Sequence, residues 1–164
     1  MKTSGGPGNW TTPAAIRQQL CDEYGLDLDV AAEAHNALTP RFLRDAFAER
    51  WKTSCRWFCN PPYGNIRPWV DRALQEASRH GNQGIALLPA STDTTWFNAA
   101  ISSGHCRFWL FVGRIHFAPP EGTKASTPSI GNVLIEFLAG YRPDVNPFIG
   151  LRSARTGEPL VRYA

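Results

Sequence analysis

The chain has 164 residues, of which 43% are hydrophobic and 12% aromatic, which is enough apolar material to bury the core of about one domain. Its formal net charge is +3 and 14 of its 17 basic residues are arginines, a balance that allows a nucleic-acid partner but is explained equally well by genomic base content. No apolar run approaches the ~20 residues that cross a bilayer, and the polar N-terminus lacks a signal peptide's apolar segment, so we expect a cytoplasmic protein without membrane contact.

The first expected element is a helix over residues 11–25, "TTPAAIRQQLCDEYG", preceded by a flexible lead at residues 1–9. Thr12 has the residue type of an N-cap, Pro13 suits the first turn, and Gly25 suits the end of the helix. The pattern therefore predicts where the ordered domain begins.

Further along the chain, helical and strand-like patterns alternate. Helices are predicted at residues 41–50, 67–81 and 93–103. Strands are predicted at residues 26–30, 56–59, 84–89, 106–112, 113–117 and 132–138. Because continuous apolar strands between helices are typical of a sheet covered on both faces, we expect an α/β fold. Its sheet should be shortened and mostly parallel, with an antiparallel strand near the C-terminal end.

The strands that end at Asp29, Asn60 and Pro89 are expected to be parallel neighbours, with the strand before Asn60 in the middle. The strand over residues 133–137 should run antiparallel beside residues 84–89. In such sheets, ligands bind at the carboxyl ends of the strands, near the point where the strand order reverses. This rule places Asn60 at the expected site.

The four cysteines are neither dense nor paired at CxxC spacing, which favours reduced, partly buried thiols over disulfides or a zinc site. They are Cys21, Cys55, Cys59 and Cys106. We therefore expect no metal.

The stretch "NPPY" at residues 60–63 has a distinctive chemistry. Proline has no N–H and a fixed φ, so the turn is rigid and presents carbonyl acceptors without donors at two positions. A planar exocyclic amine can donate one hydrogen to the Asn60 side-chain oxygen and one to the Pro61 carbonyl. Its lone pair then becomes available to an electrophilic methyl group held in line, without a general base. Tyr63 offers a face on which a heteroaromatic ring can stack.

Spacing alone leaves a Pro-Pro turn capped by a tyrosine as an equally simple interpretation. The stretch, however, resembles the motif (Asp/Asn/Ser)-Pro-Pro-(Tyr/Phe/Trp) of the S-adenosylmethionine-dependent amino-group methyltransferases. More narrowly, the chain looks like the phage-type DNA adenine N6-methyltransferases, encoded by a phage or its bacterial host. That resemblance covers roughly residues 10–138 through the segments "WTTP", "LDLDVAAEAHN", "FCNPPYGNIRPWV", "ALLPASTDTTWF" and "FVGRIHF".

The resemblance implies a Rossmann-like methyltransferase domain at residues 10–139, followed by a C-terminal tail at residues 140–164. It also implies a cofactor site for S-adenosylmethionine and a catalytic motif. The implied cofactor residues are Trp10, Thr12, Pro13, Asp29, Ala31, Ala32, Asp45 and Asn60. The implied catalytic residues are Asn60, Pro61, Pro62 and Tyr63.

Two of these assignments have a simpler alternative. The cofactor loop of the family is glycine-rich, whereas "DVAAEAHN" contains no glycine, so Asp29 is also interpretable as a solvated residue at a strand end. Asp45 is placed against the cofactor's adenine, but an exposed helix acid accounts for it equally well.

Three residues are candidates for DNA contacts: Arg67, Trp96 and Arg114. For Arg67 the alternative is a solvated helix cap, and for Trp96 it is the core. Arg114 lies in a strand-like segment that the family resemblance places near the rim of the site. The tail is expected to be loosely packed and to grip DNA or a partner subunit, since it has four arginines against two acids.

The resemblance thus implies methyl transfer from S-adenosylmethionine to adenine N6 in DNA, by a monomer or homodimer that flips the base out of the duplex. The small size favours weak or short-site specificity. Two alternatives remain open at this stage. One is a methyltransferase for another planar nitrogen, such as cytosine N4, guanine N2 in RNA or a protein glutamine. The other is a non-catalytic remnant that binds the cofactor or DNA.

Overall fold

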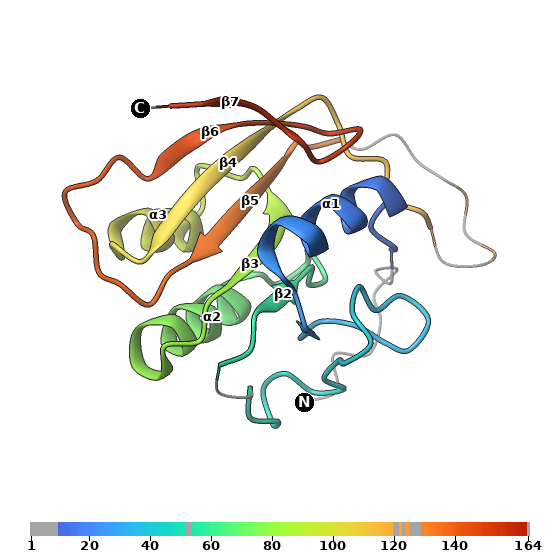
Figure 1. The fold of residues 1–164 in the computed structure, drawn as a ribbon, viewed down its shortest axis with the longest axis horizontal. Coiled ribbons are helices and arrows are strands. Elements are labelled where there is room, and N and C mark those ends of the chain that lie inside the picture. Colours follow the sequence, from blue (N-terminus) through green and yellow to red (C-terminus); the bar gives the residue numbers. More distant parts are fainter. Residues whose placement is uncertain (1–9, 52–53, 120–121, 123, 125–128, 164) are drawn as a thin grey trace.

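The computed structural model describes residues 10–51, 54–119, 122, 124 and 129–163. The expected flexible lead, residues 1–9, lies outside the described residues. The described part of the chain forms a mixed α/β fold with one seven-stranded sheet and helices on both of its faces (Figure 1). The α/β class is therefore confirmed.

The sheet has the strand order β1-β2-β3-β5-β4-β6-β7. The strands are β1 (Leu28–Asp29), β2 (Trp57–Cys59), β3 (Gly84–Pro89), β4 (Cys106–Val112), β5 (Asn132–Phe137), β6 (Phe148–Ser153) and β7 (Pro159–Arg162). β1, β2 and β3 are parallel neighbours with β2 in the middle, and β5 runs antiparallel beside β3. Both expectations about this part of the sheet are confirmed.

The sheet as a whole is mixed, where we expected a mostly parallel one. The β4–β6 pair is also parallel, whereas the β4–β5 and β6–β7 pairs are antiparallel. Parallel and antiparallel pairs are therefore equal in number, although β1, β2, β3, β4 and β6 all run in one direction.

Three helices occur in the described residues: α1 (Ala14–Tyr24), α2 (Arg67–His80) and α3 (Thr95–Ser102). α1 ends at Gly25, which adopts the left-handed conformation that glycine permits. Thr12 is not its N-cap, because Pro13 takes that position and its carbonyl accepts the first helical hydrogen bond, from the Arg17 N–H (2.9 Å). None of these helices combines the length and the apolar composition that a membrane span requires.

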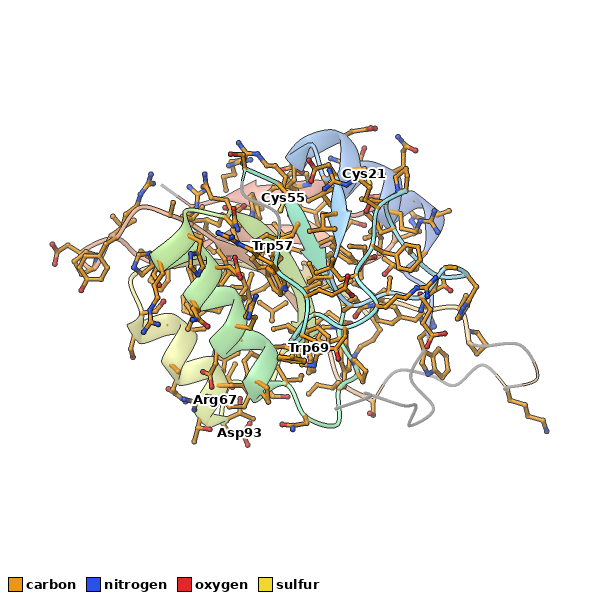
Figure 2. All side chains as sticks on the ribbon, turned by 90° about the horizontal axis from the view of Figure 1, so that it is seen from below. Cys21, Cys55, Trp57, Arg67, Trp69 and Asp93 are labelled. Atoms are coloured by element: carbon orange, nitrogen blue, oxygen red, sulfur yellow. The ribbon has the colours of Figure 1, made fainter. Side chains whose placement is uncertain are left out.

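The sheet separates two apolar clusters, and β3 contributes to both. Ile85 and Leu87 pack in the cluster that contains the buried face of α1, whereas Ala86 and Leu88 pack in the cluster of α2 and α3. Successive side chains of a strand point to opposite faces. Figures 1 and 2 show α1 on one side of the strands and the α2–α3 pair on the other. This two-sided covering explains the unbroken apolar run of β3.

Two predicted elements are absent from the described residues. Residues 41–50 contain no helix, because residues 41–43 extend along β1: the Asp29 N–H donates to the Arg41 carbonyl (2.8 Å) and the Leu43 N–H to the Asp29 carbonyl (2.9 Å). Residues 113–117 form no strand. Among the described residues, the pairing nearest to them is a bridge between Ala118 and Thr11.

Residues 140–163 are not the loosely packed tail that we expected. They supply β6, which pairs with β4, and the edge strand β7. Arg152 on β6 is completely buried. The sheet consequently has more strands than the shortened sheet that the sequence pattern predicted.

Candidate active site

The site lies at the sheet edge where β1, β2 and β3 end. Because these strands are parallel neighbours, Asp29, Asn60 and Pro89 reach the same edge, at the carboxyl ends of the strands. This is the position at which α/β sheets bind ligands. Asn60 follows β2 directly, so the NPPY stretch is held by the middle strand of the three.

Asn60 is oriented by the segment that precedes α1. Its side-chain amide nitrogen, Nδ2, donates to the hydroxyl oxygen of Thr12 at 3.4 Å, and Thr12 is itself buried. Within the described part of the chain, no donor contacts the Asn60 side-chain oxygen Oδ1 or the Pro61 carbonyl oxygen. The turn therefore offers two neighbouring acceptors, as the absence of proline N–H groups predicts.

Tyr63 is held at both its hydroxyl and its ring. The hydroxyl accepts a hydrogen bond from Asn132 Nδ2 at 2.9 Å, and the ring makes an edge contact with Phe117, with centroids 6.4 Å apart and an interplanar angle of 89°. The side chain remains 39% exposed, so part of the ring is available to a ligand.

Sequence reasoning missed Asn132 and Phe117. The one local signal for Asn132 is a polar residue at the start of a continuous apolar strand, where a core position is expected. Nothing in the sequence connects it with Tyr63, which lies 69 residues away.

Asp29 is buried, which rules out the solvated strand end considered above. It is 3% exposed, and its carboxylate accepts the N–H groups of Ala31 (3.1 Å) and Leu38 (2.8 Å). Burial raises the pKa of the Asp29 carboxyl to about 6, although both hydrogen bonds favour the ionised form and oppose that rise. The two hydrogen bonds thus hold the glycine-free loop against the Asp29 carboxylate. Ala32 in this loop is also buried.

The other cofactor candidates lie on loops. Trp10 directly precedes the bridge residue Thr11, and Pro13 is the N-cap of α1. The pairing of Thr11 with Ala118 brings this N-terminal segment beside the chain that follows β4. Asp45 accepts the N–H groups of Phe47 and Ala48, at 3.0 and 3.1 Å. These hydrogen bonds lower the pKa of its carboxyl group. It is therefore a turn cap and not the helix acid considered above.

The DNA-contact candidates differ in accessibility. Arg67 is exposed at the start of α2 (Figure 2). It pairs with Asp71 at 2.8 Å. Arg114 is exposed in the irregular segment after β4 and has no acidic partner within the described residues. Trp96 is 6% exposed and packs in the core cluster of α2 and α3, as its alternative interpretation predicted, so its ring is not available to DNA.

All four cysteines are free thiols. The described residues contain no group of three or more His, Cys, Asp or Glu side chains that could hold a metal ion.

The family model described as "DNA N-6-adenine-methyltransferase (Dam)" matches residues 6–148. A DNA N-6-adenine-methyltransferase of Escherichia phage T1 is 30% identical over 105 residues, which are 62% of this chain and 44% of the relative. A DNA N-6-adenine-methyltransferase of Haemophilus phage HP1 is 26% identical over 117 residues, which are 68% of this chain and 67% of the relative. The match thus spans less than half of the T1 protein.

Among solved structures, a modification subunit of a putative type I restriction enzyme from Vibrio vulnificus YJ016 aligns with 93% of this chain and 48% of its own, at 13% identity and a TM-score of 0.44. The family match covers most of the chain and includes the NPPY stretch, β1 to β5 and the residues that orient Asn60. The chain belongs to the DNA N-6-adenine-methyltransferase (Dam) family.

Proposed function

We propose that this chain transfers a methyl group from S-adenosylmethionine to the exocyclic N6 amine of adenine in DNA, on a Rossmann-like catalytic unit at residues 10–139 to which β6 and β7 add two strands. One observation carries the proposal. The Asn60 amide nitrogen donates to Thr12 at 3.4 Å, and no donor among the described residues contacts Asn60 Oδ1 or the neighbouring Pro61 carbonyl.

These two acceptors explain the choice of an amine. An N6 amine has two hydrogens, and it can donate one to Asn60 Oδ1 and the other to the Pro61 carbonyl. Donating both hydrogens pulls the nitrogen lone pair out of conjugation with the ring. The new carbon–nitrogen bond forms as the methyl group's bond to the sulfonium sulfur breaks, which leaves a neutral thioether. Positive charge then develops on the nitrogen, and the two acceptors stabilise it. The excess proton leaves to water afterwards, so the step requires no histidine or other general base.

The proposed cofactor supplies an electrophilic methyl group on a sulfonium centre. The residues at the sheet edge fit such a cofactor, because the Asp29 carboxylate accepts the Ala31 and Leu38 N–H groups (3.1 and 2.8 Å) and so fixes the loop at the carboxyl end of β1. We assign the binding of the cofactor to the loop that Asp29 organises and to the segment of Trp10, Thr12 and Pro13, with Asp45 as a further contact.

A stacked adenine in a duplex cannot reach this edge, so the base is flipped out, at a cost of a few kcal/mol. The exposed part of the Tyr63 ring receives the base by stacking. The exposed guanidinium of Arg114 contacts a phosphate of the DNA backbone. Arg67 does so only if it releases Asp71.

The test is a pair of substitutions at Asn60. Asn60→Ala removes an acceptor of the target amine and should lower kcat by about 10²- to 10³-fold, whereas Asn60→Asp keeps an acceptor and should retain measurable activity. Methyl transfer is measured on DNA from a host that lacks adenine methylation, and the product nucleosides are separated to distinguish N6-methyladenine from N4-methylcytosine.

Calorimetry with S-adenosylmethionine and thermal melts serve as controls for cofactor binding and folding, and both should be nearly unchanged in the two variants. Asn98→Ala is the matched variant, since Asn98 is an exposed asparagine on α3, and it should keep full activity. Full activity in Asn60→Ala, or a product other than N6-methyladenine, would contradict the proposal.

A further inference from the structure

Asn132 is a buried side chain that contacts the proposed base-stacking residue. It is 3% exposed and is the first residue of β5, where it pairs with Pro89 of β3. Its Nδ2 donates to the Tyr63 hydroxyl at 2.9 Å and to the Leu88 carbonyl at 3.3 Å. Both hydrogens of the amide nitrogen are therefore in use, one toward the motif and one toward the sheet.

This arrangement ties a loop residue to the most regular part of the sheet. β3 and β5 pair over six residues each and lie between other strands, so the backbone around Asn132 is fixed. Tyr63, by contrast, lies in the loop after β2 and is 39% exposed. An aromatic side chain on an exposed loop exchanges between rotamers on a nanosecond timescale unless a contact selects one of them.

The two contacts of Tyr63 select such an orientation. The hydrogen bond from Asn132 fixes the hydroxyl end at 2.9 Å, and the edge contact with Phe117 limits rotation of the ring. The affinity of a stacking contact depends on the ring being held before the base arrives, because ordering a side chain on binding has an entropic cost.

We propose that Asn132 is a positioning residue for the flipped base, which acts by holding the Tyr63 ring in its stacking orientation. The inference rests on the proposed function, in which Tyr63 stacks on the extruded adenine. Asn132 itself makes no contact with the substrate. Its loss should therefore weaken the hold on DNA through Tyr63 alone.

The test is a double-mutant cycle between Asn132→Leu and Tyr63→Phe, read as KM for unmethylated DNA and as kcat. Leucine has a similar size and no polar group, and phenylalanine removes only the hydroxyl. Each single variant should raise the KM for DNA by roughly 3- to 10-fold with a smaller change in kcat, because the stacking ring remains present but is no longer held in one orientation. The double variant should be no worse than the worse single variant, since both changes remove the same bond.

Asn82→Leu is the matched control for the loss of a buried asparagine. Asn82 is 1% exposed, and its amide donates to Glu76 at 2.8 Å and accepts from the Ser54 N–H at 3.1 Å. It follows α2, at the end of the sheet opposite to the NPPY turn. Asn82→Leu should lower the melting temperature without raising the KM for DNA. All assays are run at a temperature at which circular dichroism shows each variant folded.

The outcomes separate this inference from the proposed function. If Tyr63→Ala leaves the KM for DNA unchanged, the stacking step of the proposed function fails. If Tyr63→Ala raises it but Asn132→Leu does not, or if the effects of Asn132→Leu and Tyr63→Phe simply multiply, the role of Asn132 is refuted while stacking stands. Should Asn132→Leu not fold, Tyr63→Phe decides alone, and a wild-type KM in that variant overturns the inference.

Discussion

Replacing Arg152 with methionine should destabilise the fold by about 3 kcal/mol, because this guanidinium joins β6 to α1 inside the protein. Its side chain is 0% exposed. Its two terminal nitrogens donate to Glu23 at 2.6 and 2.8 Å, to the Tyr24 hydroxyl at 2.8 Å and to the Gly157 carbonyl at 2.8 Å. The guanidinium also lies over the Trp109 ring, 4.3 Å from its centroid. Methionine keeps much of the length and none of these bonds.

The magnitude follows from what the substitution leaves behind. Removing one partner of a buried ion pair costs about 3–5 kcal/mol, since the other charge remains without compensation. The Glu23 side chain is 22% exposed, so water solvates it in part and the lower end of this range applies. For a domain of this size, a loss of about 3 kcal/mol lowers the melting temperature by roughly 6–12 °C.

Arg162→Met is the matched control. Arg162 on β7 lies over the same Trp109 ring at 4.8 Å and 3.8 Å from Glu23, but its side chain is 66% exposed. Exposed pairs contribute at most about 1 kcal/mol, so this variant should melt close to the wild type. Urea unfolding and thermal melts followed by circular dichroism compare the two. Equal stability of the Arg152 and Arg162 variants would refute the argument that the buried guanidinium holds residues 140–163 in the fold.

Two further predictions concern the sheet. Burial raises the pKa of Asp29 from 3.8 to about 6, so the folded protein binds the proton more tightly than the unfolded chain, and stability should fall by up to about 3 kcal/mol as pH rises from about 4 to 6. Urea titrations should show this fall relative to Asp29→Asn, and a difference between the two proteins that is independent of pH would contradict it. Gly84→Ala should cost about 1–3 kcal/mol, because its Cβ would lie 2.1 Å from the Trp57 ring and 2.3 Å from the Trp57 carbonyl oxygen. Gly64→Ala is the control, since an added Cβ there meets no described atom within 4 Å beyond its chain neighbours, and it should melt like the wild type. Equal melting temperatures of the two alanine variants would show that β2 shifts without cost to accommodate the added methyl group.

The sequence by itself determined the elements whose signals are local and continuous. α2 has an apolar face and a terminating glycine, and β3 is an unbroken apolar run, so both were found close to their observed bounds. The parallel pairing of β2 and β3 follows from the helix α2 between them. β1 and β2 are parallel neighbours although the helix predicted between them is absent. Because NPPY directly follows a strand in the chain, its position at the carboxyl edge could be predicted without knowing the fold in detail.

Only the tertiary structure decided what depends on contacts between distant residues. Residues 140–163 carry weak local patterns and become strands because β4 offers them an edge and the buried Arg152 pairs with Glu23 on α1. Residues 41–43 lose their expected helix to pairing with Asp29. Thr12 meets Asn60 from 48 residues away and Asn132 meets Tyr63 from 69. Local periodicity carries no information about such pairs, since their hydrogen bonds form only when the sheet has assembled.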